Sequence, residues 1–113
     1  MRASSILGAR RITIMAEQLE ELLQIVLKEN ASDLHLTVGR RPTIRVSGGL
    51  VELVKYPTLT ADTARELIFT MLSKEQQERF LAEWELDFSY AYRDLSRFRV
   101  NVFRKETGIG ATF

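Results

Sequence analysis

The spacing of apolar residues switches between a helical and a strand period along this chain, and that switch most constrains the fold. Over residues 16–30, leucines and valines recur every three or four positions, which predicts an amphipathic helix ending near Asn30. Over residues 34–54, apolar residues alternate with polar ones, which predicts short strands that each bury one face. The Gly48-Gly49 pair in this stretch predicts a tight hairpin turn.

Capping residues predict two further helices in the middle of the chain. Thr60 is a good N-cap, because its hydroxyl can accept a hydrogen bond from a backbone N–H of the first turn. Ser73 opens a Ser-Lys-Glu-Gln capping box, which begins a helix over about residues 74–84. The apolar residues that this last helix is expected to bury are Phe80, Leu81 and Trp84.

Strand-like alternation returns over residues 88–92, 98–102 and 109–113. The predicted order is therefore helix, three strands, two helices and three strands. Hairpin-linked strands separated from the helices indicate an α+β domain, with a largely antiparallel sheet and helices on one face. We expect this domain over residues 16–113 and a flexible leader over residues 1–15, which carry arginine but no acid; the alternative is a start at Met15.

Composition excludes several kinds of site. The chain has no cysteine and one histidine, so a thiol nucleophile, a zinc–thiolate centre and a two-histidine metal site are excluded, and no metal is expected. No apolar run approaches the roughly 18 residues that suggest a membrane span. The formal net charge of +1 provides no global basic field, so no nucleic-acid partner is expected.

Two sets of titratable residues are candidates for acid–base chemistry. His35 suits either a general base or a half-exposed histidine hydrogen-bonded to nearby backbone, and we favour the second. Glu83, Glu85 and Asp87 form a carboxylate cluster, but they lie at a helix-to-strand junction, where a solvated or loop-capping role is commoner.

The segment from Arg93 to Lys105 stands out because basic residues greatly outnumber acidic ones in it. Strand alternation puts Arg97 and Arg99 on one face, with Asn101 continuing the row. A guanidinium group on a rigid strand suits bidentate contact with phosphate or carboxylate. The alternative is a solvated face whose arginines form ion pairs with Asp94 or Glu52.

Several motifs in their order resemble a known family. They are Ala-Ser-Asp-Leu-His-Leu at residues 31–36, Pro-Thr-Ile-Arg-Val-Ser-Gly at 42–48, Glu-Leu-Asp-Phe-Ser-Tyr at 85–90 and Ser-Arg-Phe-Arg-Val-Asn-Val-Phe at 96–103. This pattern resembles the type IV pilus retraction (twitching motility) ATPases of the type II/IV secretion ATPase superfamily. The resemblance covers about residues 16–113.

The resemblance implies a PAS-like N-terminal domain that precedes a RecA-like ATPase domain, whose P-loop motif does not occur in these residues. It implies a homohexameric motor that uses ATP and Mg²⁺. Because the P-loop motif is not in these residues, we expect no cofactor and no catalysis in this chain alone. The implied partners are the ATPase domain, neighbouring subunits and a pilus inner-membrane platform protein. The implied location is cytoplasmic, at the inner face of the bacterial cytoplasmic membrane.

By motif position, the resemblance implies that Arg97, Arg99 and Arg104 face the nucleotide phosphates, with Arg99 the best placed. Asp33 and His35 match the opening motif and are interpreted as domain-packing residues. Two alternatives stay open. One is a stand-alone PAS-like module that binds a small ligand or a protein. The other, disfavoured, is a nucleic-acid surface that uses Tyr90 and Tyr92 for stacking.

Overall fold

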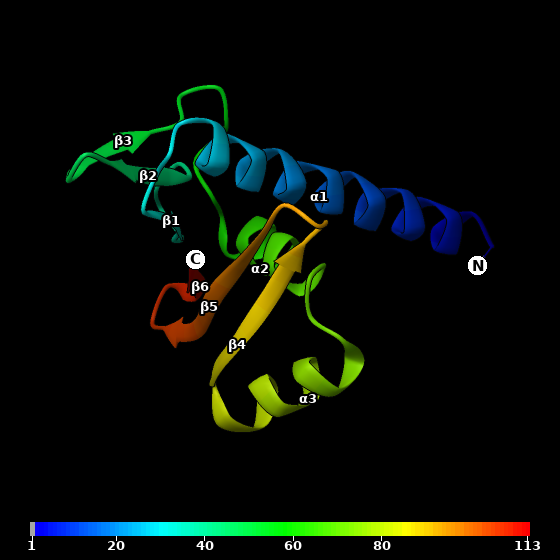
Figure 1. The fold of residues 1–113 in the computed structure, drawn as a ribbon. Helices are drawn as coiled ribbons and strands as arrows, with labels where there is room; N and C mark the ends of the chain where they lie inside the picture. The colour runs from blue at the N-terminus through cyan, green and yellow to red at the C-terminus, as the bar shows by residue number, and fades with distance from the viewer. Residues whose placement is uncertain (1) are drawn as a thin grey trace.

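The computed structural model describes residues 2–113, with side-chain surroundings from Gly8 onward. Met1, the first residue of the expected leader, lies outside the described residues. The elements follow the predicted order (Figure 1). They are α1 (Arg2–Lys28), β1 (Asp33–Leu36), β2 (Thr43–Val46), β3 (Gly49–Glu52), α2 (Ala61–Phe69), α3 (Lys74–Glu83), β4 (Glu85–Tyr92), β5 (Ser96–Lys105) and β6 (Gly108–Thr112).

The strands form one six-stranded sheet in the order β3-β2-β1-β6-β5-β4. Every neighbouring pair is antiparallel. The first three strands and the last three each form a hairpin-linked group, and the pairing of β1 with β6 joins the two groups. These pairings confirm the predicted α+β fold, while the PAS-like label stays a prediction.

The core lies between the sheet and the helices. Buried residues of α1, α2 and α3 form one apolar cluster with the buried residues of the strands. In α1 the buried stripe has the predicted helical spacing and consists of Leu19, Leu22, Leu23 and Val26. Asn30 adopts φ 54°, a left-handed conformation that ends a helix, as expected from its position.

Helix α1 is longer than predicted, because it begins at Arg2 rather than near residue 16. Its N-terminal part projects beyond the sheet (Figure 1). Arg11 in this part forms an ion pair with Glu66 of α2, which connects it to the rest of the molecule. The predicted boundary at residue 15 therefore falls inside a continuous helix, and the flexibility of residues 1–15 stays a prediction.

The end of α3 differs from the prediction. The capping box between Ser73 and Gln76 is present and Phe80 is fully buried, as expected. However, Leu81 and Trp84 are 41% and 40% exposed, so the prediction that they are buried is wrong. The helix stops at Glu83, and Trp84 caps it in a left-handed conformation with φ 60°. Its ring centre lies 5.8 Å from that of Phe80.

The hairpin between β2 and β3 turns one residue earlier than predicted. Val46 pairs with Gly49, so the two turn residues are Ser47 and Gly48. Their φ values are 51° and 83°, and positive φ at both central residues is the type I′ geometry that suits the twist of a hairpin.

Candidate functional site

The outer face of the sheet, opposite the helices, carries the predicted arginine row. Arg97 and Arg99 are exposed on β5, and Asn101 of the same row is half-buried. The alternate residues Phe98, Val100 and Val102 are buried in the core. The prediction that Arg97 and Arg99 share one exposed face is therefore confirmed.

Arg99 forms an ion pair on this face with Asp87 of β4. Its Nη2 lies 3.1 Å from Oδ2 of Asp87, and its Nε lies 3.5 Å from Oδ1. The hydrogen bond and the charge of Asp87 raise the pKa of the Arg99 guanidinium above its ordinary value. The Arg99 side chain is still 87% exposed, so the guanidinium remains open to a ligand. The partner is Asp87, whereas the sequence suggested Asp94 or Glu52.

Arg97 has only a weak neighbour on the same face, since its Nη1 lies 3.4 Å from the Oγ of Ser89. The tyrosines of β4 are on the opposite side of the sheet. Tyr92 is buried in the core and Tyr90 packs against the core, half-buried. Neither is placed to stack a base beside Arg97 and Arg99.

Arg104 is not brought together with Arg97 and Arg99. Side chains alternate along a strand, so Arg104 is on the same side of the sheet as Val100 and Val102. This side faces the helices, and Arg104 lies beyond the core. Its backbone N–H donates to the carbonyl oxygen of Trp84 at 3.2 Å. Its guanidinium carbon lies 4.4 Å from the centre of the Trp84 ring, a cation–π contact.

Asp33 and His35 lie at the start of β1, and both are part of a polar cluster on the outer face. Asp33 Oδ2 lies 2.5 Å from Nε2 of His35 and 3.3 Å from Nε of Arg45. Ser32 donates its hydroxyl to Oδ1 of Asp33 at 2.6 Å. The hydrogen bonds from Ser32, His35 and Arg45 hold the pKa of Asp33 below its ordinary value, although partial burial opposes them.

The sequence did not indicate that Asp33 is the hydrogen-bond partner of His35. The pairing depends on the register of β1 and β2, in which Asp33 stands opposite Arg45. That register brings Arg45 to the same carboxylate that His35 contacts, so the carboxylate is shared by both side chains.

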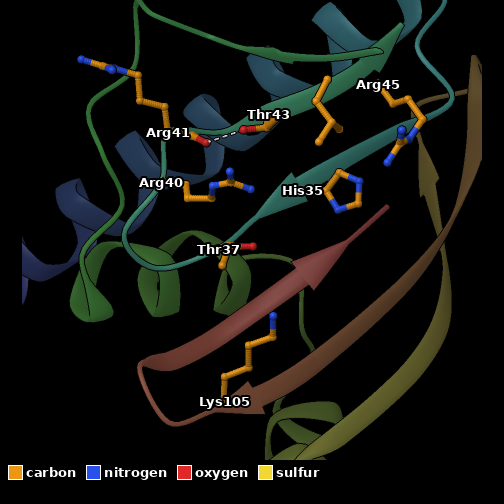
Figure 2. Close-up of a pocket in the computed structure, with 8 residues that line it drawn as sticks. His35, Thr37, Arg40, Arg41, Thr43, Arg45 and Lys105 are labelled. Atoms are coloured by element: carbon orange, nitrogen blue, oxygen red, sulfur yellow. Dashed lines mark hydrogen bonds between the residues drawn. The ribbon is translucent and has the colours of Figure 1, made fainter. Parts of the chain in front are cut away.

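A pocket of about 260 Å³ adjoins this cluster on the outer face of the sheet. Figure 2 shows Arg40, Arg45 and Lys105 directed toward the space around His35, whereas the guanidinium of Arg41 points away. The complete lining consists of His35, Thr37, Arg40, Arg41, Thr43, Arg45, Leu50 and Lys105.

This pocket was not predictable from the sequence, because its basic residues come from separate segments. The loop between β1 and β2 contributes Arg40, β2 contributes Arg45 and β5 contributes Lys105. The available signal was the Arg-Arg pair at residues 40–41, next to a glycine and a proline that mark a turn.

Backbone hydrogen bonds hold the loop that carries Arg40. The N–H of Arg40 donates to the carbonyl of Thr37 at 3.2 Å, which closes a turn around Gly39, whose φ of +89° suits glycine. Leu59 receives a bond from Gly39 at 2.8 Å and donates one to the carbonyl of Arg40 at 2.9 Å. These hydrogen bonds fix the backbone of the loop.

The turn after Lys105 is held against the same loop. Lys105 pairs with Gly108 in the sheet, and a Cβ on Gly108 would lie 3.1 Å from Cγ2 of Val38. Glycine at 108 thus permits the close approach that brings the end of β5 to the loop. Gly110 permits a second close approach, since a Cβ there would meet the Phe103 ring at 2.9 Å.

Within residues 2–113, no group of three or more histidine, cysteine, aspartate or glutamate side chains is placed to hold a metal ion. None of the helices in this described part combines the length and the apolar character needed to cross a membrane.

Comparison with known proteins identifies relatives of this chain. It is 40% identical over 93 residues to the type IV pilus retraction ATPase PilT of Pseudomonas aeruginosa, which covers 82% of this chain and 27% of PilT. It is 29% identical over 93 residues to the type IV pilus ATPase PilU of the same organism, with 82% and 24% covered. The chain thus spans about a quarter of the length of these relatives. No protein-family model matches the chain.

Solved structures agree with the sequence comparison. The crystal structure of the pilus retraction motor PilT with bound ADP superposes with a TM-score of 0.74 and 32% identity, over 82% of this chain and 27% of that one. The Legionella pneumophila ATPase DotB shares the fold, with a TM-score of 0.70, 22% identity, and 86% and 28% covered. The chain is a homologue of PilT, corresponds to the N-terminal regions of PilT and DotB, and belongs to the type II/IV secretion ATPase family.

Proposed function

We propose that this chain acts as the N-terminal domain of a hexameric ATPase motor that powers type IV pilus retraction. Supporting evidence is its 40% identity to PilT and its structural match to a PilT motor with bound ADP. In this proposal, a RecA-like ATPase domain holds ATP and Mg²⁺. The motor works in the cytoplasm, at the inner face of the cytoplasmic membrane, against a platform protein of the pilus.

The outer face of the sheet packs on the nucleotide side of the ATPase domain in this proposal. The observation that carries it is the exposed pair Arg97 and Arg99, which a rigid strand holds on one face. Charge that develops on a transferring phosphoryl group is stabilised by guanidinium groups held in advance in the right place. Arg99 is the better placed, because its ion pair with Asp87 orients a side chain that is otherwise in solvent.

The other residues that the resemblance singled out, Asp33, His35 and Arg104, have different roles in this proposal. Asp33 and His35 act as domain-packing residues, since they lie on the same outer face and are locked by Arg45 and Ser32. Arg104 is left out of the phosphate contact, because it stacks on Trp84 on the other side of the sheet.

The test is a chimera in which this chain replaces the corresponding region of Pseudomonas aeruginosa PilT. We expect the chimera to hydrolyse ATP and Arg99→Ala to lower its kcat by at least about tenfold, because a prepositioned charge donor is typically worth about 10²- to 10³-fold. Size-exclusion chromatography of each variant checks that the assembly state is unchanged.

Arg104→Ala in the same chimera is the matched control, since it removes the same group from the opposite side of the sheet. It should leave kcat close to that of the parent chimera. If Arg99→Ala hydrolysed ATP as fast as the parent, or if both variants lost activity equally, the proposed phosphate contact of the outer face would be refuted.

A further inference from the structure

The pocket beside His35 contains more positive charge than its surroundings neutralise. The basic side chains of Arg40, Arg45 and Lys105 are directed into it (Figure 2). Within the described part of the chain, neither Arg40 nor Lys105 forms an ion pair, and no acid lines the pocket. Asp33 contacts Arg45 from outside the lining and neutralises one charge. Two positive charges are therefore left without a counter-charge.

The pocket's size restricts what can balance that charge. Its volume of about 260 Å³ is just below the roughly 300–1,000 Å³ of typical small-molecule pockets. A compact anion fits this space, whereas a whole nucleotide would leave its base and sugar outside. A phosphate monoester carries about −1.5 to −2 charges at pH 7, which matches the two uncompensated cations.

The groups in the pocket have the chemistry that such an anion needs. Arg40 offers a planar set of N–H donors, Lys105 offers an ammonium group and Thr37 a hydroxyl. Lys105 lies over the Phe103 ring, with Nζ 5.3 Å from the ring centre, which restrains its long side chain. The loop that carries Arg40 is already held by the hydrogen bonds to Leu59, so binding requires little ordering.

We propose that this pocket is a binding site for a single phosphoryl group, held by Arg40 and Lys105. The proposal goes beyond the proposed motor function, because it assigns a ligand to Arg40 and Lys105 and not to Arg97 and Arg99. The phosphoryl group has two candidate sources, free inorganic phosphate and the terminal phosphate of a nucleotide.

The experiment is isothermal titration of the 113-residue chain with inorganic phosphate at low ionic strength, then with ATP and with adenosine. We expect saturable one-site binding of phosphate that weakens as salt is added, because exposed charges are screened. If ATP binds at least about tenfold more tightly than phosphate and adenosine does not bind, the nucleotide is the source. If ATP binds no better than phosphate, free phosphate is the source.

Variants connect the binding to the pocket. Arg40→Gln and Lys105→Gln should each weaken phosphate binding by about tenfold, the usual scale for one charge-assisted hydrogen bond. Both side chains are exposed, so the variants should keep the thermal midpoint of the parent. Arg79→Gln on α3 removes the same charge from an exposed position away from the lining and should leave binding unchanged.

Arg41→Gln tests whether the orientation of the side chain matters as well as its charge. The guanidinium of Arg41 points away from the pocket (Figure 2). It should weaken binding clearly less than Arg40→Gln does. Absence of saturable binding of both phosphate and ATP would overturn the proposal. Equal weakening by Arg40→Gln and Arg79→Gln would overturn it as well, because it would show a response to net charge only.

Discussion

The two faces of the sheet are formed by the same strands, but one face is buried against the helices and the other is exposed to solvent. On the inner face, Leu34, Leu36, Val100 and Val102 are completely buried against the helices. On the outer face, arginines, a lysine and the Asp33–His35 pair meet solvent. Because neighbouring residues in a strand point in opposite directions, one face can hold the fold together while the other is free for recognition. Substitutions on the two faces should therefore separate stability from binding.

The largest effect is expected from truncating the inner face. Leu36→Ala removes a fully buried side chain and leaves a cavity, so the free energy of unfolding should fall by about 2–5 kcal/mol. Chemical denaturation followed by circular dichroism measures this. Leu95→Ala, in a turn where the side chain is 67% exposed, should change it by less than about 0.5 kcal/mol. Similar losses in the two variants would contradict the comparison.

A smaller loss is expected at the close approach of Gly110 on the outer face. A Cβ at Gly110 would lie 2.9 Å from the Phe103 ring and 3.0 Å from the carbonyl oxygen of Leu36. Gly110→Ala should therefore lower the free energy of unfolding by about 1–3 kcal/mol through overpacking. The double variant with Phe103→Leu should recover part of this loss, as the ring contact is then gone.

Gly49→Ala is the matched control for this prediction. The nearest atom to a Cβ there is the carbonyl oxygen of Val46 at 3.7 Å, an ordinary contact, so the variant should be as stable as the parent or slightly more stable. If Gly110→Ala were equally well tolerated, the outer face would be loosely packed throughout.

The smallest effect is expected at the rim of the core, where Tyr56 donates a hydrogen bond to Oε1 of Glu21 at 2.8 Å. Tyr56→Phe removes this bond and should lower the free energy of unfolding at pH 7 by about 1 kcal/mol. Burial, and secondly Glu21, raise the pKa of Tyr56 to about 12. The group therefore contributes stability that is complete below pH about 10, the ordinary tyrosine value, and is lost as the pH rises toward 12.

The measurement for Tyr56 is urea denaturation of the parent and the variant from pH 8 to pH 12. The parent should lose stability more steeply than Tyr56→Phe above pH 10, so that the two curves converge. Parallel curves over the whole range would show that Tyr56 does not titrate with folding.

Much of the fold was predictable because its signals are local. The helical and strand periods identified every element in order, and the caps at Thr60 and Ser73 formed as their side chains suggested. Strand parity also predicted the shared face of Arg97 and Arg99. The burial of Leu81 and Trp84 was predicted wrongly, because α3 contacts the core through a narrow stripe around Phe80.

The candidate sites were less predictable, since they depend on which segments meet. Motif position grouped Arg104 with Arg97 and Arg99, yet the odd–even alternation of β5 turns Arg104 to the other side, onto Trp84. The pocket was missed for the same reason, as no local pattern connects residue 40 with Lys105.

By itself, the sequence determined the order of helices and strands, the side of each strand that is buried and the family to which the chain is related. Those properties follow from side-chain periodicity and from motifs a few residues long. Only the tertiary structure decided that β1 pairs with β6, that Asp33 is shared by His35 and Arg45, and that Arg40 and Lys105 meet in one pocket. Strand register and loop packing set these contacts, and both are properties of the whole folded chain.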